Sequence, residues 1–155
     1  MKAITIHQPW AHLLVMGQKI HETRSWKTSH RGPIAIHAAR KFTEDMRNLC
    51  GLSPFHESLS LAPKKLPLGS IIGVVNLVDC IPAEELELAV HPTREEQFGD
   101  FRPGRWAWKM EQPRLLEVPI PYQGKLGLFD VPNDLFQGNA ILMALINAVA
   151  ANTQK

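Results

Sequence analysis

Residues 6–38 read IHQPWAHLLVMGQKIHETRSWKTSHRGPIAIHA, and this stretch decides the fold. Within it, Pro9 suits the first turn of a helix and Gly17 supplies the residue at which that helix ends. Alternating apolar and polar residues before and after the helix favour short strands. The stretch and the residues just before it therefore predict a helix flanked by strands over Lys2–Ile6, Ile20–Trp26 and Pro33–Ala38.

The rest of the chain extends this pattern into a larger sheet. Residues 70–79, SIIGVVNLVD, are nearly all β-branched or leucine, which is typical of a central strand, and Arg105–Met110 is predicted to pair within the same sheet. Residues 52–69 hold three prolines and predict a loop insertion, whereas residues 132–151 predict a C-terminal helix. Strands interrupted by helices without regular βαβ alternation indicate an α+β fold with a curved sheet or β-barrel.

Composition places the chain in an ordinary class of protein. With 155 residues, 45% hydrophobic and 21% charged, it is expected to form one globular domain over residues 1–155. No apolar run is long enough to span a membrane, and no leader segment is evident at the N-terminus, so we expect a cytoplasmic location. Cys50 and Cys80 are expected to be reduced thiols.

The cations are concentrated in one segment. Between Gly17 and Lys41 lie six cationic residues and a single acid, Glu22, which gives this segment a charge of +5. Because the whole chain has a net charge of +2, the remainder carries −3. This asymmetry indicates a site for an anion, and the alternative is a basic loop that only improves solubility. The cations are Lys19, Arg24, Lys27, Arg31, Arg40 and Lys41.

Three short motifs occur in order in the first third of the chain: QPWA, then GQKIHETRSW, then RGPIAIHA. Together they closely resemble the start of ASCH domains, and GVVNLVDC, FGDFRPGRWAWKM and GKLGLFDVP resemble the later strands of stand-alone bacterial and phage members. The resemblance implies a PUA-like β-barrel with flanking helices. It also implies a pocket at the junction between the first helix and the following strand, in a family inferred to bind RNA.

Some small members with a similar fold are amidohydrolases that act on acetylated cytidine, using a lysine, a threonine three residues later and a distant glutamate. The resemblance places Lys19 at the lysine position, but the residue three positions later is Glu22, so the hydroxyl nucleophile is missing. Thr23 is adjacent, yet on a regular strand it would face the other way. Glu95 or Glu96 remains as a candidate distant acid. Another branch of the family is credited with nuclease activity.

The residues themselves suggest how such a pocket could bind a ligand. A converging Lys19 and Glu22 would form an acid–base pair, able to contact a base edge or to activate water. Glu22, Arg24 and Trp26 share parity on the predicted strand, and a guanidinium beside an indole suits single-stranded RNA. Trp26 is equally consistent with a core position, and Trp10, Trp106 and Trp108 are expected in the core. Lys27 and Arg31 would contact phosphate.

Three functions remain open at this point. The first is binding of RNA or a modified nucleotide through Lys19, Glu22, Arg24 and Trp26. The second is hydrolysis of a nucleoside amide or of RNA, with Lys19 and Glu22 in acid–base roles. The third is a protein-interaction module with a vestigial pocket. The histidines form no metal-binding pattern and the chain has no nucleotide-cofactor motif, so neither a metal nor a cofactor is expected.

Overall fold

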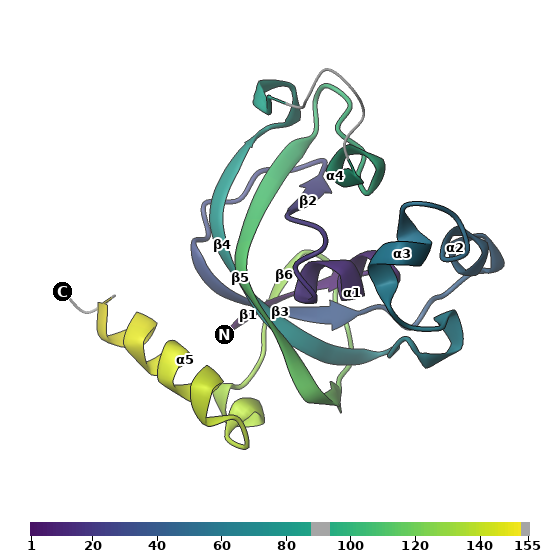
Figure 1. Cartoon of the computed structure of the whole chain (residues 1–155). Helices are drawn as coiled ribbons and strands as arrows, with labels where there is room; N and C mark the ends of the chain where they lie inside the picture. The colour runs from purple at the N-terminus through teal and green to yellow at the C-terminus, as the bar shows by residue number, and fades with distance from the viewer. Residues whose placement is uncertain (88–93, 153–155) are drawn as a thin grey trace.

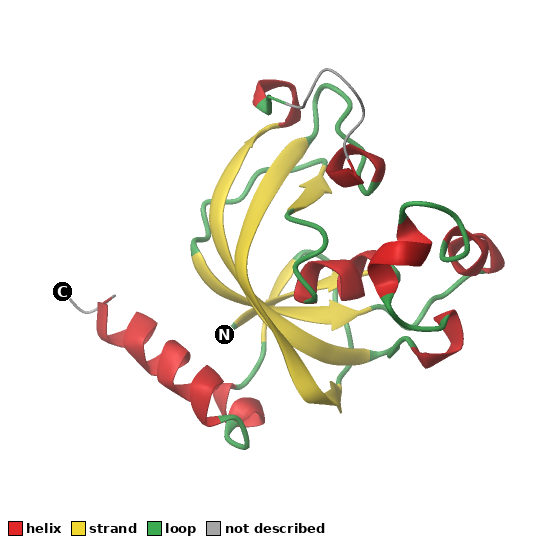
Figure 2. Ribbon diagram, in the orientation of Figure 1, coloured by secondary structure: helices red, strands yellow, loops and turns green. Residues whose placement is uncertain are grey.

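The computed structural model describes residues 1–87 and 94–152. A single six-stranded sheet in the order β2-β5-β4-β3-β1-β6 organises these residues, and it curls into a half-barrel around α1 (Figures 1 and 2). Only β1 and β3 pair in parallel, and every other neighbouring pair is antiparallel. The strands are β1 (Lys2–Ile6), β2 (His21–Arg24), β3 (Gly32–Ala38), β4 (Ser70–Pro82), β5 (Trp106–Pro121) and β6 (Leu128–Asp130).

The helices lie around this sheet at different places. α1 occupies the concave side, α2 and α3 lie beyond its open end, and α5 lies outside the curl (Figure 1). Short 3₁₀ turns cover Pro63–Lys65, Ala83–Glu85 and Asn133–Phe136. The helices are α1 (Trp10–Val15), α2 (Glu44–Leu49), α3 (Phe55–Leu59), α4 (Arg94–Gln97) and α5 (Ala140–Asn152). No helix in residues 1–87 and 94–152 is both long and apolar enough to cross a membrane.

Strand periodicity explains why the sheet has two buried faces. Along β3, Ile34 and Ile36 pack with α1 and the concave-side core, while Ala35 between them belongs to the cluster under α5. Successive side chains of a strand point to opposite faces, so a strand that is apolar at nearly every position is covered on both sides. β4 follows the same rule, which confirms the prediction that residues 70–79 form an interior strand.

Several predicted elements differ from the structure in their bounds. The strand predicted over Arg105–Met110 is longer in the structure, because β5 runs on to Pro121 through Gln112, which has a φ of 49°, with register shifts against β4. The bulged backbone around Gln112 lets a strand continue where the sequence suggests an interruption.

Two other segments also fold differently from the prediction. Residues 52–69 were predicted as a loop but hold α3, because Phe55 and Leu59 bury against Leu13 in a third hydrophobic cluster. The helix predicted over residues 132–151 begins at Ala140, and a 3₁₀ turn over Asn133–Phe136 precedes it.

Candidate functional site

A cleft of about 1460 Å³ opens on the concave side of the sheet. It lies between the curled strands, the start of α1, the α2–α3 segment and two loops. Residues far apart in the sequence therefore share one cavity. Its walls are built from parts of residues 5–10, 19–24, 37–41, 97–105 and 121–127, with Leu49, Phe55 and Gly69.

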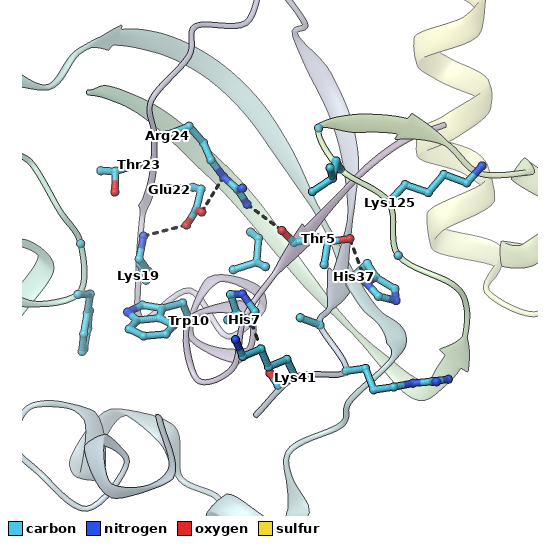
Figure 3. Close-up of a pocket in the computed structure, with 18 of the residues that line it drawn as sticks. Thr5, His7, Trp10, Lys19, Glu22, Thr23, Arg24, His37, Lys41 and Lys125 are labelled. Carbon is cyan, nitrogen blue, oxygen red and sulfur yellow. Dashed lines mark hydrogen bonds and ion pairs between the residues drawn. The ribbon is translucent and has the colours of Figure 1, made fainter. Parts of the chain in front are cut away.

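Lys19, Glu22 and Arg24 form a linked set of charges in this cleft (Figure 3). Lys19 Nζ lies 3.4 Å from Glu22 Oε2 and donates to the carbonyl oxygen of His21. Glu22 Oε1 lies 3.0 Å from Arg24 Nε, and Arg24 Nη2 donates to the carbonyl oxygen of Thr5 at 2.8 Å. The exposed fractions of the three side chains are 1%, 11% and 25%. We call this set the charged triad.

Local backbone geometry brings the triad together. α1 ends at Val15, and Gly17 follows with a φ of 71° that suits a glycine. The amides of Gln18 and Lys19 both donate to the carbonyl of Leu13. The chain then enters β2, where Glu22 and Arg24 lie two residues apart and face the same side. The structure thus brings Lys19, Glu22 and Arg24 together at the cleft, and their role in binding stays a prediction.

Glu95 has a different position from the one expected of a distant catalytic acid. Its carboxylate accepts from the backbone amides of Ile20 and His21 at 2.6–3.0 Å, and it lies 3.4 Å from His21 Nδ1. Burial alone would raise the pKa of Glu95, but the hydrogen bonds from His21 and Ile20 outweigh it and leave the pKa lowered. Glu95 therefore fastens α4 to the start of β2, while neither it nor Glu96 lines the cleft.

His37 anchors the loop that closes the far side of the cleft. Its Nε2 lies 2.8 Å from the carbonyl oxygen of Tyr122 and its Nδ1 lies 3.2 Å from Thr5 Oγ1. Because a carbonyl only accepts, Nε2 carries the proton and Thr5 donates to Nδ1. A Cβ at Gly124 would lie 2.7 Å from both His37 and Thr5, so this loop fits closely only with glycine there. His37 therefore both lines the cleft and holds the loop in place through its hydrogen bonds.

Protonation of buried histidines is expected to destabilise the fold in mild acid. Burial lowers the pKa of His37 and of His12 from the ordinary 6.5, although backbone carbonyls of Tyr122 and Leu59 partly oppose this. The folded state therefore binds fewer protons than the unfolded state, and stability present above the unfolded pKa is lost as pH falls. Urea unfolding at about pH 7.5 and about pH 5.5 should show the lower free energy in acid.

A His37→Gln variant provides the control, because glutamine can still donate to Tyr122 but does not titrate. Its loss of stability between the two pH values should be smaller than that of the parent. Equal losses in both proteins would mean that His37 does not contribute to the pH dependence.

Cations lie along the rim of the cleft. Arg40 and Lys41 are exposed, follow directly after β3, and form no ion pair within residues 1–87 and 94–152. Lys125 reaches the same cleft from the loop after β5. The two acids that line the cleft are Glu22 and Asp100, and both are already engaged by arginines. The neighbouring Arg102 lowers the pKa of Asp100 to about 2. The rim therefore carries positive charge that these two acids do not neutralise.

One part of the cleft wall is apolar and aromatic. Trp10, Leu49, Phe55 and Phe98 all line it, and Trp10 meets Phe55 edge-on with ring centroids 6.2 Å apart. Trp10 is half-buried and packs against two hydrophobic clusters. The cleft thus combines an aromatic wall with a charged triad and a cationic rim.

Three residues predicted to bind the ligand lie outside the cleft. Trp26 packs edge-on against Trp108 at 4.7 Å, Lys27 lies over the ring of Trp106, and Arg31 lies 3.6 Å from Asp79. For Trp26 the reason is that β2 ends at Arg24. The alternation of side chains along the strand therefore does not extend to Trp26, and its side chain need not face the same side as Glu22 and Arg24. Thr23, expected to face away from Glu22, also lines the cleft because residues 97–105 form a wall on its side.

Sequence reasoning missed other residues that line the cleft. In the sequence, Arg40 and Lys41 stand out only as members of a segment with excess positive charge. Their position just beyond the end of a predicted strand is the signal that could have marked them as cleft residues. Trp10 was expected in the core because it shares the apolar face of its helix. Lys125 lies more than eighty residues away from Arg40 and has no local signal at all.

Comparison with known proteins gives consistent results for the family and the fold. The sequence model described as "ASCH domain" matches residues 4–119. The chain is 28% identical over 138 residues to Activating signal cointegrator 1 from Homo sapiens and equally to that from Mus musculus, covering 87% of this chain. It spans about 23% of the length of these relatives.

Solved structures with the same fold come from Zymomonas mobilis. The crystal structure of ASCH from that organism matches with a TM-score of 0.54 at 15% identity, covering 88% of this chain and 90% of that one. A mutant of the same protein matches with a TM-score of 0.53 at 17% identity, covering 91% and 94%. At these identities the likeness shows the fold, a PUA-like half-barrel.

Proposed function

Since the chain belongs to the ASCH domain family, we propose that it binds RNA or a modified nucleotide in the cleft described above. The observation that carries the proposal is the charged triad facing a cleft whose rim holds Arg40 and Lys41, which form no ion pair in the described part of the chain. Surface ion pairs contribute little to stability, and burying charge is costly. A buried and connected set of charges at a cleft is therefore best explained by a ligand that it contacts.

Each part of the cleft has a function in this proposal. The Glu22 carboxylate accepts from an exocyclic amino group of a base, while Lys19 and Arg24 donate to carbonyl or ring acceptors. Arg40, Lys41 and Lys125 contact phosphate oxygens, a contribution that holds the ligand without reading its sequence. In this proposal the cations at the rim determine the affinity for the ligand, and the carboxylate in the cleft determines which base is preferred.

The first test concerns the rim. Three cations on one single strand predict a slope of log affinity against log salt of about −2. The double variant Arg40→Ala, Lys41→Ala should reduce the slope to about −1 and weaken binding roughly tenfold at low salt. Fluorescence anisotropy with labelled RNA across a salt series measures both quantities.

The matched control is Lys64→Ala, Lys65→Ala, which removes two exposed cations that lie outside the cleft. This control should keep the slope of the parent. If both double variants change the slope equally, RNA contacts the protein through its general charge and not through the cleft.

A hydrolase acting on a nucleoside amide or on RNA is the second candidate, and one observation favours it. Lys19 and Glu22 form a close, buried ion pair that lines the cleft, as an acid–base pair would. Glu95, whose oxygens are held by backbone amides, is poorly placed as its partner. Incubation with acetylated cytidine and with short RNAs should distinguish binding alone from turnover, and Lys19→Ala should abolish any turnover.

A further inference from the structure

Trp10 occupies a position that a core residue does not need. It is half-buried, it lines the cleft, and in Figure 3 its indole lies directly beside Lys19, near Glu22. The edge-on contact with Phe55 supports the Trp10 ring, and the ring centroids of Phe55, which is buried, and Phe98 lie 4.9 Å apart. Trp10 is thus an immobilised aromatic surface next to the polar groups that would read a base edge.

The cleft is also larger than one nucleotide requires. Pockets for single drug-sized molecules measure roughly 300–1,000 Å³, and this one measures about 1460 Å³. Its cations are spread around the rim, with Arg40 and Lys41 after β3 and Lys125 on the loop that follows β5. Three separate cations along the rim can contact more than one phosphate of a strand.

We propose that Trp10 is the base-stacking residue of a site for single-stranded RNA of about three nucleotides, in which one base stacks on the indole while neighbouring phosphates contact the rim. This inference rests on the proposed function and specifies its ligand: an internal stretch of a strand and not a free nucleotide. Stacking and hydrogen bonding then act on the same base, since the indole supports its face and Glu22 accepts from its edge.

Substitution of Trp10 tests the stacking. Trp10→Leu keeps an apolar side chain but removes the aromatic face, and it should weaken binding of a cytidine trinucleotide about 5- to 30-fold. Trp10→Phe keeps a smaller aromatic face and should lose much less. The matched control is Trp26→Leu, which removes another half-buried indole in an edge-on aromatic pair but outside the cleft. It should affect stability but leave affinity unchanged.

Fluorescence supplies a readout that packing alone would not change. Stacking of a base on Trp10 should quench part of the tryptophan emission of the parent, and Trp10→Phe should bind the trinucleotide without this quenching. Quenching that persists in Trp10→Phe, or affinity that is equal in Trp10→Leu and the parent, would overturn the inference. Trp10→Phe also keeps the test valid if Trp10→Leu fails to fold.

Ligand length tests the rest of the proposal. Cytidine monophosphate, dinucleotide, trinucleotide and tetranucleotide should bind with affinity and salt slope that increase to about three nucleotides and then level off. Uridine oligonucleotides of equal length lack the exocyclic amino group and should bind more weakly. A monophosphate that binds as tightly as the trinucleotide would contradict the inference and leave the proposed function standing. Failure of every nucleotide and oligonucleotide to bind the parent would contradict the proposed function itself.

Discussion

Replacing Glu22 with alanine should lower the free energy of unfolding by about 3 kcal/mol, because Lys19 and Arg24 would remain half-buried or buried without their shared anion. Removing one partner of a buried ion pair leaves an uncompensated charge, and here two cations would also repel each other. This expected loss of stability lies at the low end of the range for breaking a buried ion pair, because Arg24 keeps contact with water. Urea unfolding followed by tryptophan fluorescence measures the difference.

Two comparisons separate the charge from the contacts. Glu22→Gln keeps the acceptor oxygen and should lose less stability, while altering which nucleotide is preferred more than it alters overall affinity. Glu111→Ala breaks an exposed ion pair with Lys109 and should cost no more than about 0.5 kcal/mol. A loss at Glu22 no larger than that at Glu111 would show that the triad is solvated.

An apolar replacement of the whole triad distinguishes stability from function. The triple variant Lys19→Met, Glu22→Leu, Arg24→Met should be as stable as the parent within about 1 kcal/mol, or more stable, since well-packed apolar groups often replace a buried ion pair without loss. It should bind RNA much more weakly and without base preference, because the rim cations and Trp10 remain but the groups that contact the base edge are gone. Unchanged stability with this loss would establish that these charges serve the ligand, and binding like that of the parent would contradict the proposed site.

Gly73→Ala should destabilise the protein by about 3 kcal/mol or more, because the added Cβ has no space. It would lie 2.6 Å from the backbone oxygen of Arg114 on β5 and 2.6 Å from Val15 Cγ1 on α1. The first contact cannot be relieved by a side-chain rotation, so β4 and β5 would have to separate locally. Thermal and urea unfolding measure the loss.

The neighbours of Gly73 supply the controls. Val15→Ala in the Gly73→Ala background removes the contact with Val15 Cγ1 but keeps the one with Val15 Cβ at 2.9 Å, so it should recover only part of the stability relative to the sum of the single variants. Gly138→Ala adds a Cβ that meets nothing within 4 Å and should change stability by no more than about 0.5 kcal/mol. If Gly73→Ala is as mild as Gly138→Ala, α1 does not pack on β4 as closely as described.

Elements with a strong local signal were predicted correctly from the sequence. The run of β-branched residues over 70–79 is the interior of β4, and the helix after Pro9 ends where Gly17 permits. Helix α3 was not predicted because it has only five residues. It is stabilised by contacts with Leu13 and Phe98, which are distant in the sequence and leave no local pattern. Similarly, β5 continues through Gln112 only because β4 pairs with both of its halves.

The candidate site could likewise be predicted where neighbouring residues in the sequence build it, and not where distant segments do. Lys19, Glu22 and Arg24 converge because one helix end and one short strand, adjacent in sequence, place them. Parity failed at Trp26 because the strand ends two residues earlier, a boundary that the sequence does not mark. Lys125 joins Arg40 only through the pairing of distant strands, and that information is tertiary.

The pairing of β1 with β6 has a consequence for how the protein is made. β1 is synthesised before the other strands of this sheet, yet one of its edges is covered only when Leu128–Asp130 is available. At roughly 5–20 residues per second, a nascent chain would keep that edge open for on the order of ten seconds. An open strand edge is a template for pairing with another chain. A fragment ending at residue 119, the limit of the family match, would contain the whole charged triad. It would leave that edge of β1 uncovered permanently and would also lack the loop of residues 121–127. Such a fragment should therefore aggregate.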